Sequence, residues 1–198
     1  DSGEPGDAKA RIIQSSAMPV HRKDLMGILK GSRSTKFRCA AAVALGRLAA
    51  NHIESQELLL AGLQKGKDER VRAACFFGLS ENLSPELGPE IVKGLKRYIS
   101  ARSDDQHRIF RFLAFLAGDL GLNDAAPVLL NAATLSKNEL TWRIAAVNFW
   151  KCAGRSAEKK IREDFDRASN DRQIERLAAV FGRSTREQEF KYLVRQFR

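Results

Sequence analysis

The sequence repeats one pattern, an alanine-rich amphipathic segment that returns five times along 198 residues. In each copy the apolar residues follow the i, i+3, i+4, i+7 spacing that places them on one face of a helix. Successive copies start at nearly constant spacing, at Phe37, Val71, Ile109, Trp142 and Ile174. A single helix of this kind cannot bury its apolar face without a neighbour. The repeat therefore predicts an all-α chain of stacked helical units with no strand.

A shorter amphipathic segment precedes each copy, and short breaks rich in Gly, Pro, Ser and Asn separate the two. These shorter helices are expected within residues 25–29, 58–63, 91–99, 128–133 and 161–168, and a last helix within 190–197. The repeating unit is thus a helix pair. We expect one repeat domain over residues 20–198. Residues 1–19 read as an N-terminal tail with room for a partial helix, and the polar Asp1–Ala8 stretch predicts a loose tail.

The stretch DERVRAACFFGL, residues 68–79, resembles the second helix of a HEAT repeat of the phycobilisome-lyase type, with its D-x-x-V-R-x-A-A pattern. The resemblance covers most of the chain, and the fold it implies is a right-handed α-solenoid of about five helix pairs plus a C-terminal helix. In that family the acidic and basic residues of the pattern tie successive repeats into a ladder. Carried over position by position, the resemblance implies ladder pairs of Asp68 with Arg72 and of Glu139 with Arg143, and the first repeat keeps Arg38.

Residues typical of catalysis are scattered rather than clustered. The three histidines and three cysteines lie far apart, at His21, His52, His107, Cys39, Cys75 and Cys152. No CxxC pair or His-Glu dipeptide is present, and neither is a P-loop, a G-x-S-x-G elbow or a G-x-G-x-x-G motif. Metal centres need several converging ligands, so this distribution disfavours one. We therefore expect no enzymatic activity, no metal and no cofactor, with the cysteines acting as small hydrophobic residues.

The net charge of +10 is concentrated at the two ends of the chain. It amounts to +5 in residues 1–52, +1 in 53–103, zero in 104–154 and +4 in 155–198. One interpretation is an ordinary solvated surface, and the other is a surface that binds an anionic partner. The candidate binding residues are Arg47, Arg70, Arg111, Lys151 and Arg176 on the second helices, and Lys159, Lys160 and Arg162 near the C-terminus.

Two functions remain open from the sequence. The first is a non-catalytic scaffold whose concave face, lined by the second helices, binds a protein partner. An acidic protein is one candidate for that partner. The alternative is a basic HEAT-like protein that contacts the phosphate backbone of a nucleic acid. A protein similar to the HEAT-like DNA-repair glycosylases is one form of this alternative. The alternative gains if the basic residues form one continuous groove, and it loses if they alternate with Glu81, Asp119 and Glu175.

Membrane insertion is not expected, because no run approaches the roughly 20 apolar residues of a membrane span. A cytoplasmic location is the expectation. A signal peptide removed before Asp1 stays open as the alternative.

Overall fold

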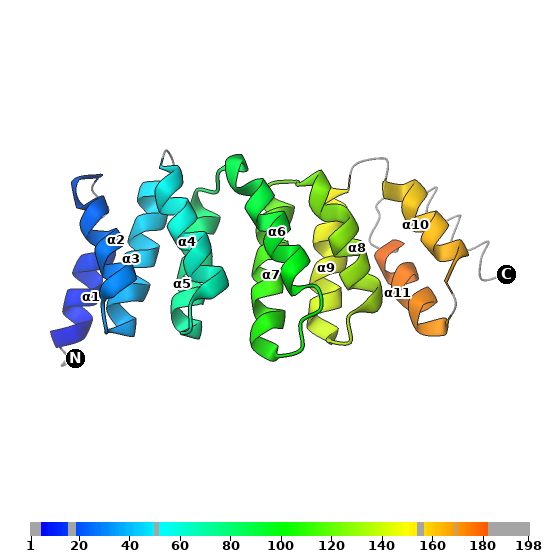
Figure 1. The fold of residues 1–198 in the computed structure, drawn as a ribbon, viewed down its shortest axis with the longest axis horizontal. Coiled ribbons are helices and arrows are strands. Elements are labelled where there is room, and N and C mark those ends of the chain that lie inside the picture. The colour runs from blue at the N-terminus through cyan, green and yellow to red at the C-terminus, as the bar shows by residue number, and fades with distance from the viewer. Residues whose placement is uncertain (1–4, 16–18, 50–51, 154–156, 169, 182–198) are drawn as a thin grey trace. The chain divides into compact units, whose positions relative to one another are not determined.

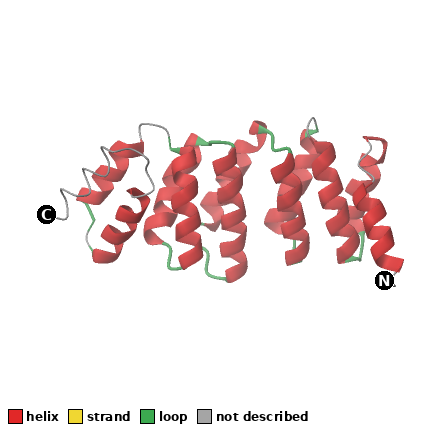
Figure 2. Cartoon of the chain, turned by 180° about the vertical axis from the view of Figure 1, so that it is seen from behind, coloured by secondary structure: helices red, strands yellow, loops and turns green. Residues whose placement is uncertain are grey.

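The computed structural model describes residues 5–15, 19–49, 52–153, 157–168 and 170–181, and it divides into two compact units, Asp1–Leu87 and Gly88–Arg198. The described residues form eleven α-helices and three short 3-10 helices, and they include no strand (Figure 2). The prediction of an all-α chain is confirmed.

The first unit is built from two helix pairs and one leading helix (Figure 1). Its elements are α1 (Pro5–Ser15), η1 (Pro19–His21), α2 (Arg22–Gly31), α3 (Thr35–Leu48), α4 (Ile53–Lys65), α5 (Glu69–Glu81) and η3 (Pro85–Leu87). Helix α2 packs on α3, and α4 packs on α5, while α3 also lies between α1 and α5. Helices α1, α3 and α5 therefore form one layer, which α2 and α4 cover on one side.

Helix α1 corrects one expectation. It begins at Pro5, inside the Asp1–Ala8 stretch for which the sequence predicts a loose tail, so that prediction is wrong from Pro5 onward. A proline suits the first turn of a helix because the N–H it lacks would have no partner there. The helix is held in place by tertiary contact, since it packs on α3 and the carbonyl of Gln14 accepts a hydrogen bond from Arg47.

The core of the first unit depends on the close approach of α3 and α5. Ala42 of α3 lies at this contact, where its carbonyl oxygen is close to Gly78, and its side chain is fully buried. At the crossing point Gly46 meets Gly78: a Cβ atom placed on Gly46 would lie 2.3 Å from the Gly78 Cα. Small residues on these two faces therefore set the spacing between the helices.

The second unit repeats the arrangement. Its elements are α6 (Gly88–Tyr98), α7 (Asp104–Asp119), η4 (Asn123–Ala125), α8 (Ala126–Leu135), α9 (Glu139–Cys152), α10 (Ala157–Asp166) and α11 (Asp171–Phe181). Helix α6 packs on α7, α8 on α9 and α10 on α11, while α7 and α9 pack on each other. The helix expected within 190–197 lies outside the described residues.

Each of the four central second helices starts at a capping side chain. The side chain of Ser34 accepts a hydrogen bond from a backbone N–H of α3, Asp68 does so for α5, Ser103 for α7 and Asn138 for α9. Such caps satisfy N–H groups that the first turn of a helix leaves without a partner. The sequence therefore determines where each second helix begins, and with it which residues face solvent.

Candidate functional site

The candidate site in the first unit is the solvent-facing side of α3 and α5. Helical spacing places one residue of each turn on this side. We call it the α3–α5 face. It consists of Lys36, Cys39, Val43 and Arg47 on α3, and of Arg70, Ala73, Phe77 and Glu81 on α5, all of them exposed or half-buried.

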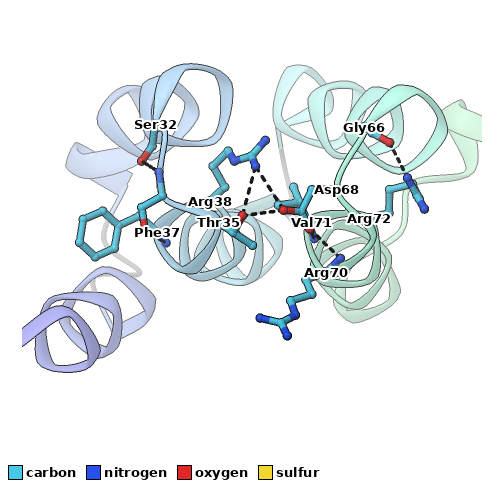
Figure 3. Close-up of polar contacts among 10 residues, drawn as sticks. Ser32, Thr35, Phe37, Arg38, Gly66, Asp68, Arg70, Val71 and Arg72 are labelled. Atoms are coloured by element: carbon cyan, nitrogen blue, oxygen red, sulfur yellow. Dashed lines mark hydrogen bonds and ion pairs between the residues drawn. The ribbon is translucent and has the colours of Figure 1, made fainter. Parts of the chain in front are cut away.

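At one end of this face a polar cluster joins the two helices (Figure 3). The Asp68 carboxylate accepts a hydrogen bond from the Thr35 hydroxyl at 2.5 Å, and the Arg38 guanidinium lies 3.5 Å from the same oxygen. The other carboxylate oxygen accepts the backbone N–H groups of Arg70 and Val71 at 2.9 and 3.3 Å. The Thr35 hydrogen bond contributes most to lowering the pKa of Asp68, and the backbone N–H groups and Arg38 add to this effect.

The residues implied as a ladder take different partners in the two units. Arg72 is buried, with 3% of its surface exposed, and donates to the Gly66 carbonyl at 2.7 Å. The Asp68 carboxylate reaches back to Arg38 in the preceding helix pair. In the second unit Glu139 and Arg143 form an ion pair within α9, at 2.6 Å. The contact between successive pairs is thus observed for Arg38 and Asp68.

At the opposite end of the α3–α5 face the charges pair with each other. The Arg47 guanidinium lies 3.8 Å from the Glu81 carboxylate and also donates to the Gln14 carbonyl at 3.3 Å. The second unit has a matching pair, since the Lys151 ammonium lies 3.1 Å from the Asp119 carboxylate. Two of the cations predicted to bind an anion are therefore paired with carboxylates of the neighbouring second helix.

Arg70, an exposed cation of this face, differs from Arg47 in the contacts of its side chain. Its backbone N–H bonds to Asp68, but its side chain is directed away from that carboxylate (Figure 3). The guanidinium makes no ion pair with a described residue.

The largest apolar group on the α3–α5 face is Phe77, whose side chain is 60% exposed. Its ring lies 5.6 Å from that of Phe76, in a tilted arrangement. Val43 occupies the equivalent position of α3, one repeat earlier, and is half-buried. Sequence reasoning did not single out Phe77, although the residue lies off the apolar stripe of its helix, and that was the available signal.

In the second unit, two of the predicted binding residues are held by contacts within the protein, and Arg176 is buried. Arg176 on α11 is 7% exposed, donates to the Thr134 carbonyl at 3.1 Å and stacks over the Trp142 ring, 5.4 Å from its centroid. Burial is the main cause that lowers its pKa, and nearby Arg172 adds to the effect. Arg111 is half-buried and lies 3.4 Å from the Asn138 side-chain oxygen. Both side chains anchor helices to one another.

The three predicted residues near the C-terminus all belong to α10. Lys159 is exposed and Arg162 is half-buried. Lys160 lies in the same helix, and the structure does not describe its side chain. They do not share a helix with the other five.

Two hollows border α8 in the second unit. One, of about 340 Å³, lies between α8 and the α10–α11 pair, and the other, of about 450 Å³, lies beside the α6–α7 turn. Leu135 borders both hollows and is 57% exposed. His107 lines the larger one, where its ring nitrogen lies 3.3 Å from the Thr141 hydroxyl. Both linings mix polar and apolar side chains.

The cysteine thiols of the described residues are all free, and their environments suppress ionisation. Burial raises the pKa of Cys75 to about 12 and that of Cys152 to about 11. Burial and the nearby Asp68 carboxylate also raise the pKa of Cys39. A nucleophilic cysteine needs the opposite shift.

Comparison with known proteins adds no family to this description. No protein-family model matches the chain, and no curated protein matches it. Two observations concern the described residues alone. They hold no group of three or more His, Cys, Asp and Glu side chains placed to bind a metal, and none of their helices is long and apolar enough to cross a membrane.

Proposed function

We propose that this chain is a non-catalytic scaffold that binds a protein partner through the exposed side of its second helices. In this proposal the helix pairs of both units continue one right-handed HEAT-like solenoid, and the second helices line its concave face. The pairs within each unit support it, because equivalent second helices lie side by side in α3 and α5 and again in α7 and α9.

The observation that carries the proposal is the exposed Phe77 beside Val43. Phe77 has 60% of its surface in water, on a face whose other side chains are charged or smaller. Phenylalanine is among the aromatic residues that are enriched at protein interfaces. Aromatic side chains contribute much of the binding free energy at protein interfaces because they bury a large area at a low cost in conformational entropy.

The contacts of the basic residues weigh against the nucleic-acid alternative. Arg47 and Lys151 are paired with carboxylates, and Arg176 is buried among protein groups. Phosphate binding needs cations free to replace counterions along a continuous path. These three residues therefore do not form a continuous positive groove within either unit.

The test is selection from a random peptide library displayed on phage, with the full chain as the target. We expect enriched peptides that bind the wild type and bind Phe77→Ser at least about 10-fold more weakly, since an interface aromatic is worth a few kcal/mol. Phe110→Ser is unsuitable as a comparison because Phe110 is fully buried, so Leu135→Ser, at an exposed apolar residue of α8, the first helix of its pair, is the matched control.

Peptides that bind wild type and Phe77→Ser equally well would show that the α3–α5 face is not the binding surface. The Leu135→Ser variant should retain the affinity of the wild type for peptides that depend on Phe77. Circular dichroism of both variants checks that neither substitution alters the helical content.

A further inference from the structure

The first unit carries a concentration of positive charge at one end. The turns α2–α3 and α4–α5 lie at the same end of the unit (Figure 1). We call the exposed cations around these two turns the basic rim; they are Lys30, Arg33, Lys36, Lys65, Lys67 and Arg70. Of the described side chains at this end, two are carboxylates, Asp68 and Glu69, and Asp68 is already bound to Arg38.

The register between α3 and α5 shows that these cations are neighbours across the repeat. Arg47 and Glu81 hold equivalent positions in successive repeats and form an ion pair, so residues at equivalent positions lie side by side. The same offset along the sequence relates Arg33 to Lys67 and Lys36 to Arg70. In each of these two pairs, a cation of one repeat lies beside a cation of the next.

The two ends of the α3–α5 face are therefore built differently. At the far end opposite charges meet and neutralise each other, whereas at the basic rim like charges meet. Neighbouring like charges repel, and an anion placed between them removes this repulsion. Arg33, Lys67 and Arg70 make no ion pair with a described residue, so their charge is available to a partner.

The apolar part of the same face lies at a fixed distance from the rim. Phe77 follows Arg70 by two helical turns, so it lies on the same side of α5 and about 10 Å further along the axis. Ala73 lies between them, and Cys39 and Val43 occupy the matching positions of α3. The face thus presents cations, then small side chains, then an apolar patch, then a neutral ion pair.

We infer that the first unit binds an acidic segment of a protein partner, with carboxylates at the basic rim and an apolar side chain against Phe77 and Val43. The inference rests on the proposed function and adds the chemistry of the partner. A protein segment fits better than a nucleic acid, because a phosphate backbone that follows α5 beyond Phe77 meets the Glu81 carboxylate.

The probe is a fluorescein-labelled peptide with four glutamates followed, three residues later, by a Leu-Phe dipeptide. Three extended residues span about 10 Å, the separation of Arg70 from Phe77. Fluorescence anisotropy with the full chain should show binding that weakens as salt is raised. Replacing the Leu-Phe by two serines, or the glutamates by lysines, should weaken the binding at least about 10-fold.

Charge reversal locates the site. Lys67→Glu with Arg70→Glu should weaken binding of the acidic peptide at least about 10-fold. The matched control is Lys96→Glu with Arg97→Glu, two exposed cations of α6 in the second unit, which changes the net charge equally. The control should change the affinity by less than about 2-fold. The pair Lys67→Gln with Arg70→Gln, a milder change, should give an intermediate loss if the reversed pair proves unstable.

Three results would overturn the inference. They are an absence of binding by the acidic peptide, equal losses for the two charge-reversed pairs, and tighter binding of a labelled oligothymidine that responds to the same variants. The phage selection separates this inference from the proposed function. If peptides that depend on Phe77 are enriched without acidic residues, the scaffold stands and the acidic partner does not. If no enriched peptide depends on Phe77, the α3–α5 face is not the binding surface, and both the proposed function at this face and the acidic partner fail.

Discussion

The Asp68 carboxylate connects local and tertiary structure in a single side chain. It caps α5 through two backbone N–H groups and binds Thr35 and Arg38 of the preceding helix pair. These contacts favour the ionised carboxylate, and they lower its pKa. A group whose pKa is lower in the folded state stabilises the fold fully above its unfolded value, here near 3.8, and loses that effect as the pH falls toward the folded value.

We expect Asp68→Asn to lower the thermal midpoint of unfolding at pH 7, and the difference from wild type to shrink as the pH is lowered below about 4. Thr35→Val should reproduce part of the effect because Thr35 contributes most to the lowered pKa. Glu57→Gln, at an exposed carboxylate of α4, is the control. Thermal melts between pH 7 and pH 3 measure this; a difference between Asp68→Asn and wild type that stays constant over that range would contradict the account.

For individual residues, the sequence predicted which side chains are buried better than it predicted which groups they bond to. The apolar stripe identified Ala41, Ala44 and Leu79 as core residues because the period of a helix determines which residues face inward. The partners of Arg47 and Arg176 were not predictable, since they depend on which residues of neighbouring helices come into register. The exposure of Phe77 was missed because the stripe identifies the buried side of a helix and does not rank the residues outside it.

Two glycines, Gly46 and Gly78, determine how closely helices α3 and α5 pack. A Cβ on Gly46 would lie 2.3 Å from Gly78 backbone atoms, which cannot move aside as a flexible side chain can. A Cβ on Gly78 would lie 2.5 Å from the Ala42 carbonyl oxygen. The two helices must separate to accept either methyl group, and the surrounding core then loses contacts.

Gly46→Ala is therefore expected to lower the free energy of unfolding by about 1–3 kcal/mol, despite the higher helix propensity of alanine. The matched control is Gly27→Ala in α2, where nothing lies within 4 Å of the added Cβ. That change should stabilise the protein by about 0.5–1 kcal/mol. Urea unfolding of the two variants measures both effects, and stabilisation by Gly46→Ala would rule out the close crossing.

Helix type and order were predictable at this scale, whereas the start and extent of the first helix, expected only as a partial helix within residues 1–19, were not. The structure places the second helices where the repeated stripes predict them, and the structure adds that Ser34, Asp68, Ser103 and Asn138 cap them. Helix α1 lacks a complete copy of the stripe, and its position depends on contact with α3. Local sequence does not encode a contact of that kind.

For the whole molecule, we propose that the helix pairs of both units form one stack whose second helices present a binding face. Tandem pairs with equivalent contacts in each unit support it, since a repeat that buries its apolar face against neighbours extends in one direction. A compact domain of this length would instead have a radius of gyration of about 16 Å.

Small-angle X-ray scattering from the full chain in solution tests this claim most directly. A single row of helix pairs spaced about 10 Å apart predicts an elongated particle with a radius of gyration of about 20 Å or more. A value of about 16 Å, with a symmetric distance distribution, would contradict the stack and remove the continuous binding face with it.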